Sequence, residues 1–188
     1  MKILLGLVGE KGSGKGTFAA LLRQRLTDAS LEVFRFSDIL FETLNRWHIP
    51  TTRENLQKLA VIMESFGSGT LSRAIKERVA KSTADIVVLD GIRWESDEAV
   101  LRNYPNNHLM YIRADASIRF SRLVARKEKS GEGETTWKQF LKEEHASNEI
   151  TIPQIGLRAD TAVIHNGDMK NLDLQVEKFY LEHVAALV

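Results

Sequence analysis

The sequence predicts an α/β fold in which helices cover both faces of a parallel sheet, a three-layer α/β/α sandwich. Three observations support this prediction. Four short apolar runs lie far apart in the chain and lack polar alternation, as expected of strands buried on both faces. Helical patterns fill the intervals between these runs. A glycine-rich loop joins the first run directly to the first helix.

The expected sheet has five strands. Each of the four apolar runs is flanked by polar residues or by glycine, which marks the ends of a strand. A weaker fifth strand, Val33–Phe36, follows the first helix. The four runs are Ile3–Val8, Ile86–Leu89, Leu109–Ile112 and Thr161–Ile164.

The expected helices are segments whose apolar residues recur every three or four positions. The first helix opens in the glycine loop and carries Phe18, Leu21, Leu22 and Leu26 on one face. In chain order the expected helices are Lys15–Asp28, Ile39–Trp47, Arg53–Phe66, Leu71–Lys81, Ser96–Asn103, Ser117–Glu128, Trp137–Ser147 and Asn171–Val184.

The 188 residues are enough for one sizeable core, so we expect a single domain. Two segments exceed a simple strand–helix–strand crossover. About three helices separate the second and third strands, which indicates a helical insertion. The polar stretch KEKSGEGETT interrupts two helices, which indicates a mobile loop or lid. The expected division of residues 1–188 is a core of residues 1–36, 83–126 and 148–188, an insertion of residues 37–82 and a lid of residues 127–147.

The composition excludes several classes of site. The chain has no Cys, which rules out a disulfide framework, a thiolate zinc site and a Cys nucleophile. Its five His are scattered, so we interpret them as surface or packing residues. The formal net charge of +1 indicates neither a nucleic acid nor a membrane partner. No apolar run approaches the ~18 residues of a membrane span, and MKILLGLVG is too short for a signal peptide, so we expect a cytoplasmic protein.

The glycine loop has the pattern of a phosphate loop, G-x-x-x-x-G-K, after a strand and at the start of a helix. Glycines let backbone N–H groups surround a phosphate, the helix terminus adds its dipole, and Lys15 adds a positive charge. A dinucleotide fingerprint fits less well because its third glycine comes one position early. The expected phosphate-binding residues are Gly9, Gly12, Ser13, Gly14, Lys15, Gly16 and Thr17.

The ending G-S-G-K-G-T resembles the loop of adenylate kinase and other nucleoside monophosphate kinases. The resemblance implies a P-loop kinase fold that binds ATP and Mg²⁺, with the metal held largely by nucleotide and water. A hydroxyl directly after Lys15 is then not obligatory, and Thr17 is the hydroxyl expected near the metal. Lys11 departs from the pattern, because adenylate kinases usually carry Pro there.

The stretch VVLDGIR supplies further charged groups. Asp90 ends a buried strand, and in such folds an acidic residue at this place lies beside the phosphate loop and holds Mg²⁺ through water. The alternative is that Asp90 caps the turn before Gly91. Arg93 follows at the same edge and would clamp a phosphate of the acceptor, unless it forms a surface salt bridge.

Residues after the second strand are the expected contacts of the phosphate acceptor. In nucleoside monophosphate kinases the acceptor-binding segment starts at this point, which here reads FRFSDIL. Asp38 would contact the acceptor or orient its attacking oxygen, and Ser37 would contribute to the same site or act as a helix N-cap. Arg53 and Gln57 lie one helical turn apart and would reach the acceptor's phosphate or base, although TTRE is also a good helix start.

Arg119, Arg122 and Arg126 recur every three or four residues and form one helical stripe. Arginines that a closing lid delivers stabilise the charge on a transferred phosphate. A solvated helix face is the alternative. The stripe follows the fourth strand, where nucleotide kinases place their lid arginines. We therefore predict that Arg122 and Arg126 act with Lys15 and Asp90 in catalysis and that Arg119 binds ATP.

The segment ADTAVIHNGDMKNLDLQVEKF resembles the C-terminal part of dephospho-CoA kinase and its relatives, in which a strand ends in Asn and Gly before a last helix. The resemblance implies that Asn166 and Gly167 lie beside the adenine of ATP. A plain Asn-Gly turn is the alternative.

These features predict a kinase that moves the γ-phosphate of Mg²⁺-ATP to a nucleotide-like small molecule, foremost a nucleoside or deoxynucleoside monophosphate. Dephospho-CoA is an alternative acceptor, whereas shikimate and gluconate fit less well because their kinases usually lack so long an insertion. A regulatory ATPase or a binding module stays open, and a GTPase is disfavoured because Asn-Lys-x-Asp is missing. Phe41, Trp47 and Trp94 would stack an acceptor base or belong to the core. The oligomeric state is not predicted.

Overall fold

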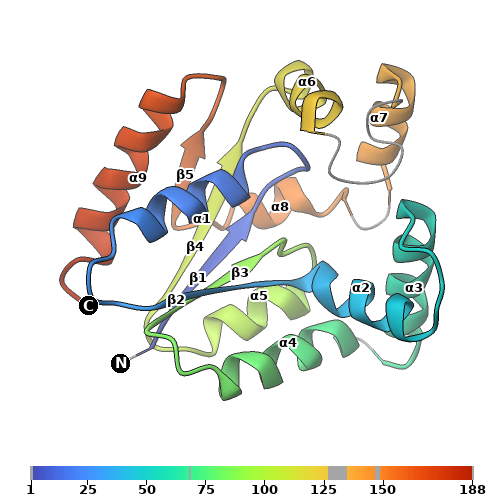
Figure 1. The fold of residues 1–188 in the computed structure, drawn as a ribbon, viewed down its shortest axis with the longest axis horizontal. Coiled ribbons are helices and arrows are strands. Elements are labelled where there is room, and N and C mark those ends of the chain that lie inside the picture. The colour runs from blue at the N-terminus through green and yellow to red at the C-terminus, as the bar shows by residue number, and fades with distance from the viewer. Residues whose placement is uncertain (1, 68, 127–134, 147–148, 188) are drawn as a thin grey trace.

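The computed structural model describes residues 2–67, 69–126, 135–146 and 149–187. It confirms the predicted sandwich, in which five parallel strands form one sheet between two layers of helices (Figure 1). The strands are β1 (Ile3–Val8), β2 (Leu31–Arg35), β3 (Ile86–Asp90), β4 (Asn107–Arg113) and β5 (Thr161–Ile164).

β1 lies at the centre of the sheet, whose strand order is β2-β3-β1-β4-β5. Leu7 of β1 is in register with Asp90 of β3, and Asp90 is in register with Arg35 of β2. Since all strands are parallel, their carboxyl ends meet at one edge of the sheet. The residues that follow β1, β2 and β3 therefore come together, which is where α/β sheets place their ligands.

The helices follow the predicted order, with boundaries that differ by a few residues. They are α1 (Lys15–Gln24), α2 (Phe36–Arg46), α3 (Arg53–Ser65), α4 (Thr70–Lys81), α5 (Glu95–Arg102), α6 (Ala116–Arg126), α7 (Trp137–Glu144), α8 (Ile152–Gly156) and α9 (Met169–His183).

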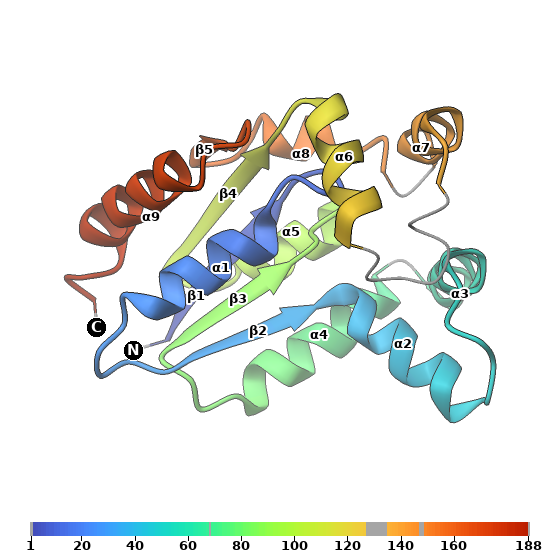
Figure 2. The ribbon, with the colours of Figure 1, turned by 45° about the horizontal axis from the view of Figure 1, so that its top comes forward.

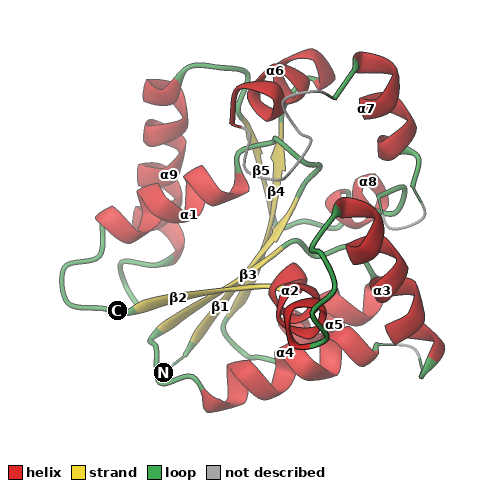
Figure 3. Ribbon diagram, turned by 45° about the vertical axis from the view of Figure 1, so that its right-hand side comes forward, coloured by secondary structure: helices red, strands yellow, loops and turns green. Residues whose placement is uncertain are grey.

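Alternate residues of the buried central strand face two separate apolar clusters. Ile3, Leu5 and Leu7 pack with residues of α1 and α9, whereas Leu4 and Val8 pack with residues of α2, α4, α5 and α8. Figures 2 and 3 show the two helical layers on opposite sides of the sheet. This arrangement explains why the strands show apolar runs without polar alternation.

Two elements differ from the prediction. The strand expected at Val33–Phe36 is Leu31–Arg35, and Phe36 instead opens α2, three residues before the expected start. Phe36, Ile39 and Leu40 have the spacing of one helix face and are buried in the same cluster. Phe36 therefore belongs to α2 because its side chain packs with this helix face. The short helix α8, which begins with Ile152 and Pro153, was not predicted.

The elements that flank the carboxyl edge are α2 and α3 on one side and α6 and α7 on the other, while both chain termini lie at the opposite end of the sheet (Figure 2). Of the lid expected at residues 127–147, residues 127–134 and 147–148 lie outside the described residues, and much of the remainder forms α7. In the part of the chain that the structure describes, no helix is both long and apolar enough to cross a bilayer.

Gly6 in β1 offers a test of the packing at the centre of the sheet. A Cβ at Gly6 would lie 2.6 Å from Ile92 Cδ1 and 2.6 Å from Leu101 Cδ2. Overpacking of this kind costs about 1–3 kcal/mol, so we expect Gly6→Ala to lower the free energy of unfolding in urea by that amount. Gly16→Ala is the control, because nothing lies within 4 Å of its added Cβ. An equal loss in both variants would contradict the tight packing around Gly6.

Candidate active site

The phosphate loop runs from the end of β1 into α1, and at two of its glycines neighbouring atoms lie too close for a side chain. Gly12 has a φ of 76°, and a Cβ there would lie 2.7 Å from the backbone oxygen of Arg119. Gly14 is the N-cap of α1 with a φ of 105°, and a Cβ there would lie 2.4 Å from Nδ1 of His165. Both positions therefore require glycine, for conformation and for space.

Lys15 folds back over this loop. Its Nζ donates to the carbonyl oxygens of Gly9, at 2.7 Å, and Glu10, at 3.2 Å. Burial lowers the pKa of Lys15 and nearby Arg93 lowers it further, while Asp90 and Glu149 oppose the shift. A buried ammonium of this kind is stabilised by an incoming anion.

Asp90 lies beside the loop, at the carboxyl end of β3. Its Oδ2 is 3.5 Å from Nε of Arg35, while its buried Oδ1 has no hydrogen-bond partner among the described residues. Asp90 and Thr17 line the same cleft. An unpartnered carboxylate oxygen in a cleft that a hydroxyl also lines suits Mg²⁺ or a water that binds it. Among the described residues, no group of three or more His, Asp or Glu side chains is arranged to hold a metal ion by itself.

Arg93 is held from three sides. Its guanidinium lies 3.1 Å from Oε1 of Glu149, which is buried, and its carbonyl accepts a hydrogen bond from the hydroxyl of Thr151. Its backbone N–H donates to Oδ2 of Asp97 at 3.0 Å. The Arg93 side chain remains one-third exposed (34%) and lines the cleft. It therefore faces the cleft in a fixed position while its charge is partly balanced.

The three arginines of the predicted stripe differ in their surroundings. Arg122 donates from Nη2 to the carbonyl of His165 at 2.9 Å and from Nη1 to that of Gly12 at 3.3 Å, and it lines the cleft. Arg119 is buried and forms a two-pronged ion pair with Glu144 of α7, at 2.9 and 2.6 Å. It does not line the cleft. Arg126 ends α6, and its side chain is not among those described.

At the end of β5, the cleft is lined by His165, Gly167 and Met169. Asn166 lies instead in a separate hollow, and its Oδ1 accepts a hydrogen bond from the backbone N–H of Asp115 at 2.9 Å. Gly167 thus lines the cleft, whereas the Asn166 amide is turned to another part of the surface.

At the other end of the cleft, α2 and α3 contribute Ser37, Asp38, Phe41 and Gln57. Asp38 also accepts a hydrogen bond from the Arg35 backbone N–H at 3.3 Å and so stabilises the start of α2. Ser37 lies inside this helix, so the alternative N-cap role is wrong.

The other residues expected near the acceptor differ in their positions. Arg53 begins α3, but its side chain is not among those described. Trp47 is 55% exposed and does not line the cleft, whereas Trp94 does.

The two ends belong to one continuous cleft of about 1250 Å³. Pockets that bind one drug-sized ligand measure roughly 300–1,000 Å³, so this cleft is larger than one such ligand requires.

Sequence reasoning missed several residues that line the cleft, among them Arg35, Glu149 and His165. Arg35 follows from the register of β2 with β3 and needs only the correct end of β2 to be found. Glu149 and His165 carry no signal in the sequence, since long-range packing brings both to the loop. Burial lowers the pKa of His165, and neighbouring Arg122 lowers it further.

The fold and the site define a protein with a phosphate loop in a three-layer α/β/α sandwich. The sequence model of the AAA_17 family, described as AAA domain, matches residues 8–140, and the chain belongs to this family. The matched range starts at the last residue of β1 and includes the phosphate loop, Asp90, Arg93 and α6.

Among related sequences, the chain is similar to the "UPF0200 protein" of Hyperthermus butylicus, with 23% identity over 178 residues that cover 94% of this chain and 92% of the relative. It is also similar to the "UPF0200 protein PH1008" of Pyrococcus horikoshii, with 26% identity over 182 residues that cover 94% and 95%.

Among solved structures, TT1252 from Thermus thermophilus matches with a TM-score of 0.66 and 19% identity over 96% of this chain and 97% of its own. Shikimate kinase from Bacteroides thetaiotaomicron matches with a TM-score of 0.63 and 15% identity over 95% and 97%. Such low identity shows the fold alone.

Asp97 provides a pH test of the loop that carries Arg93. It is buried at the start of α5 and accepts hydrogen bonds from Ser72 Oγ at 2.6 Å and from the N–H groups of Arg93 and Trp94. Burial raises its pKa to about 6, against about 3.9 in the unfolded chain. Between these values the folded state binds more protons, so Asp97 contributes less stability as the pH rises from about 4 to about 6.

Asp97→Asn removes this titration and keeps the shape of the side chain. We expect the free energy of unfolding of the variant to rise relative to the wild type by roughly 2–3 kcal/mol between pH 4 and pH 7, in urea titrations at each pH. Asp28→Asn, at an exposed position, is the matched control and should follow the wild type. Parallel pH profiles of the wild type and Asp97→Asn would show that Asp97 does not titrate in this range.

Proposed function

We propose that this protein is an ATP-dependent kinase that transfers the γ-phosphate of Mg²⁺-ATP to a nucleotide-like small molecule, foremost a nucleoside or deoxynucleoside monophosphate. The observation that carries the proposal is the single cleft with the phosphate loop at one end and α2 and α3 at the other. A protein that only bound or hydrolysed a nucleotide would not need the second end.

On the nucleotide side, the loop amides and the start of α1 bind the phosphate chain, and Lys15 moves from the loop carbonyls to the phosphates. Mg²⁺, bound through Asp90 and Thr17, would neutralise charge on the phosphate oxygens. Arg122 adds charge near the transferred group from its position against Gly12 and His165. Gly167 and Met169 line the end of the cleft at which we expect the adenine.

On the acceptor side, Arg93 binds the phosphate of the acceptor, and Asp38 and Gln57 bind its polar groups. Phe41 and Trp94 provide aromatic surface for a base. In the transfer step an oxygen of the acceptor forms a bond to the γ-phosphorus as the bond to the β–γ bridging oxygen breaks, and ADP leaves. The protein contributes position and charge, which is what phosphoryl transfer requires.

A panel of acceptors tests the proposal. Mg²⁺-ATP is incubated with nucleoside and deoxynucleoside monophosphates, dephospho-CoA or shikimate, and ADP release is measured. ADP that forms only with one of the monophosphates supports the proposal. ADP that forms only with dephospho-CoA or shikimate would identify that compound as the acceptor instead. ADP without any acceptor supports a regulatory ATPase instead. Nucleotide binding without ADP under any condition supports a binding module.

Lys15→Ala tests the mechanism. Loss of one preorganised positive group at the transferred phosphate costs about 10²–10³ in rate, so we expect kcat/KM with the active acceptor to fall by this factor. The matched control is Lys178→Ala on α9, which removes an exposed lysine far from the cleft and should retain full activity. Full activity in Lys15→Ala would overturn the proposed role of the loop.

A further inference from the structure

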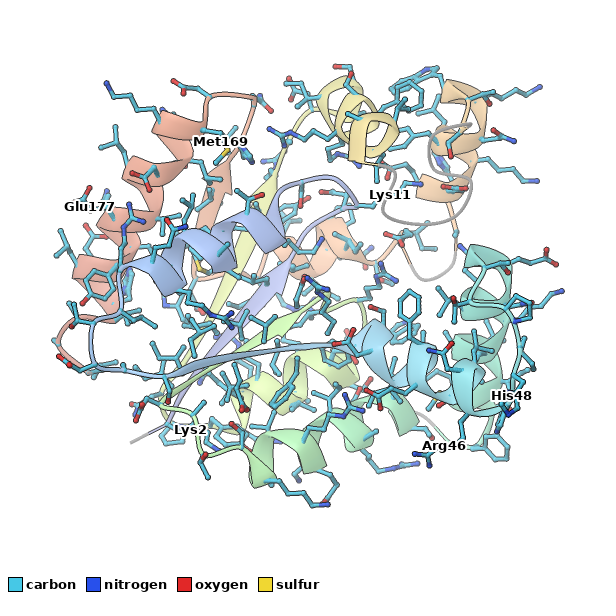
Figure 4. The ribbon with its side chains drawn as sticks, viewed as in Figure 1. Lys2, Lys11, Arg46, His48, Met169 and Glu177 are labelled. Atoms are coloured by element: carbon cyan, nitrogen blue, oxygen red, sulfur yellow. The ribbon has the colours of Figure 1, made fainter. Side chains whose placement is uncertain are left out.

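Lys11 is a second lysine within the phosphate loop, at one of the positions that the pattern G-x-x-x-x-G-K leaves unspecified. Lys11 lines the cleft together with Lys15 and Arg122. Its ammonium forms an ion pair with Glu143 of α7 and lies 4.8 Å from the centre of the Phe140 ring. Figure 4 shows Lys11 at the tip of the loop, on the side of α7. The loop therefore carries an additional positive charge that α7 holds.

The contact between Lys11 and Glu143 is not the main anchor of α7. The next residue, Glu144, holds the buried Arg119 with two hydrogen bonds, and Arg119 also donates to the carbonyl of Ala114 at 2.9 Å. Phe140 is fully buried, and its ring packs against those of Phe120 and Trp137. Helix α7 thus stays docked through its buried contacts if the Lys11 ammonium moves.

The ion pair of Lys11 is the more accessible of the two. The side chain of Glu143 is 27% exposed, compared with 15% for Glu144. The Lys11 side chain itself is 10% exposed, and an ion pair with one partner in contact with water is exchanged more readily than a fully buried one. The phosphate chain of ATP carries several negative charges, and a lysine ammonium on a flexible stem can exchange one anion for another at little cost.

We propose that Lys11 is a second phosphate-binding cation of the loop. It pairs with Glu143 of α7 in the absence of nucleotide and binds the phosphate chain when a nucleotide binds. The inference rests on the proposed function, because it requires a nucleotide at the loop. Glu143 then competes with the nucleotide for Lys11. Nucleotide binding removes one charged contact between the loop and α7 and leaves the anchor at Glu144 intact.

The test measures binding of ATP and of inorganic tripolyphosphate by calorimetry at constant ionic strength, in the full chain. Lys11→Met should weaken binding of both by about tenfold, the loss of one charge-assisted contact. Glu143→Gln should strengthen binding by a few-fold, because it removes the competitor. In the Lys11→Met background, Glu143→Gln should have no effect, because its action passes through Lys11.

The ion pair of Lys178 with Glu182 on α9 is the matched control, and Lys178→Met and Glu182→Gln should leave both affinities unchanged. Equal affinity in the wild type and Lys11→Met, with or without a lower melting temperature, would overturn the inference and leave the proposed function standing. A gain from Glu143→Gln that is the same in both backgrounds would show general charge repulsion and also overturn it.

Two further results complete the test. If Lys11→Met does not fold, the affinities of the Glu143→Gln variant provide the test, because Glu143 is partly exposed. An unchanged affinity of this variant would overturn the inference. A wild type that binds neither ATP nor tripolyphosphate would overturn the inference and the proposed function together. ATP binding without phosphate transfer would contradict the proposed function only.

Discussion

The close approach of the phosphate loop to Arg119 and His165 is the constraint on which the rest of the site depends. Gly12 lies against the backbone of Arg119, and Gly14 lies against the ring of His165, so that neither position has room for a side chain. Arg122 completes the contact by bonding to carbonyl groups of both the loop and His165. The loop is therefore held in shape by α6 and the end of β5, which reduces the ordering that a ligand must impose.

The charges around the cleft follow one pattern, in which carboxylates hold some cations and backbone carbonyls hold others. Asp90 pairs with Arg35, and Glu149 pairs with Arg93. Lys15 and Arg122, in contrast, bond to backbone carbonyls. Burial lowers the pKa of both Lys15 and Arg122. These two are the cations that a bound anion would stabilise most, because a carbonyl offsets a positive charge less than a carboxylate does.

Much of the fold and part of the site could be predicted from the sequence. Apolar runs mark buried strands, and the pattern of Gly9, Gly14 and Lys15 is local in the chain, so both are visible without a structure. Spacing placed Arg119 and Arg122 on one helical stripe. The ion pair that holds Arg119 away from the cleft is formed with Glu144, which lies 25 residues further along the chain than Arg119. The orientation of Asn166 likewise depends on Asp115, a contact between distant segments.

The sequence by itself determined the class of fold, the position of the phosphate loop at the end of the first strand, and Asp90 at the end of a neighbouring strand. These features depend on local patterns of polarity and glycine, which a chain carries wherever it folds. Only the tertiary structure decided which arginine faces the cleft, which carboxylates compensate Arg93 and Arg119, and how α7 holds Lys11. Ion pairs between distant segments depend on how the layers pack, and no local pattern encodes them.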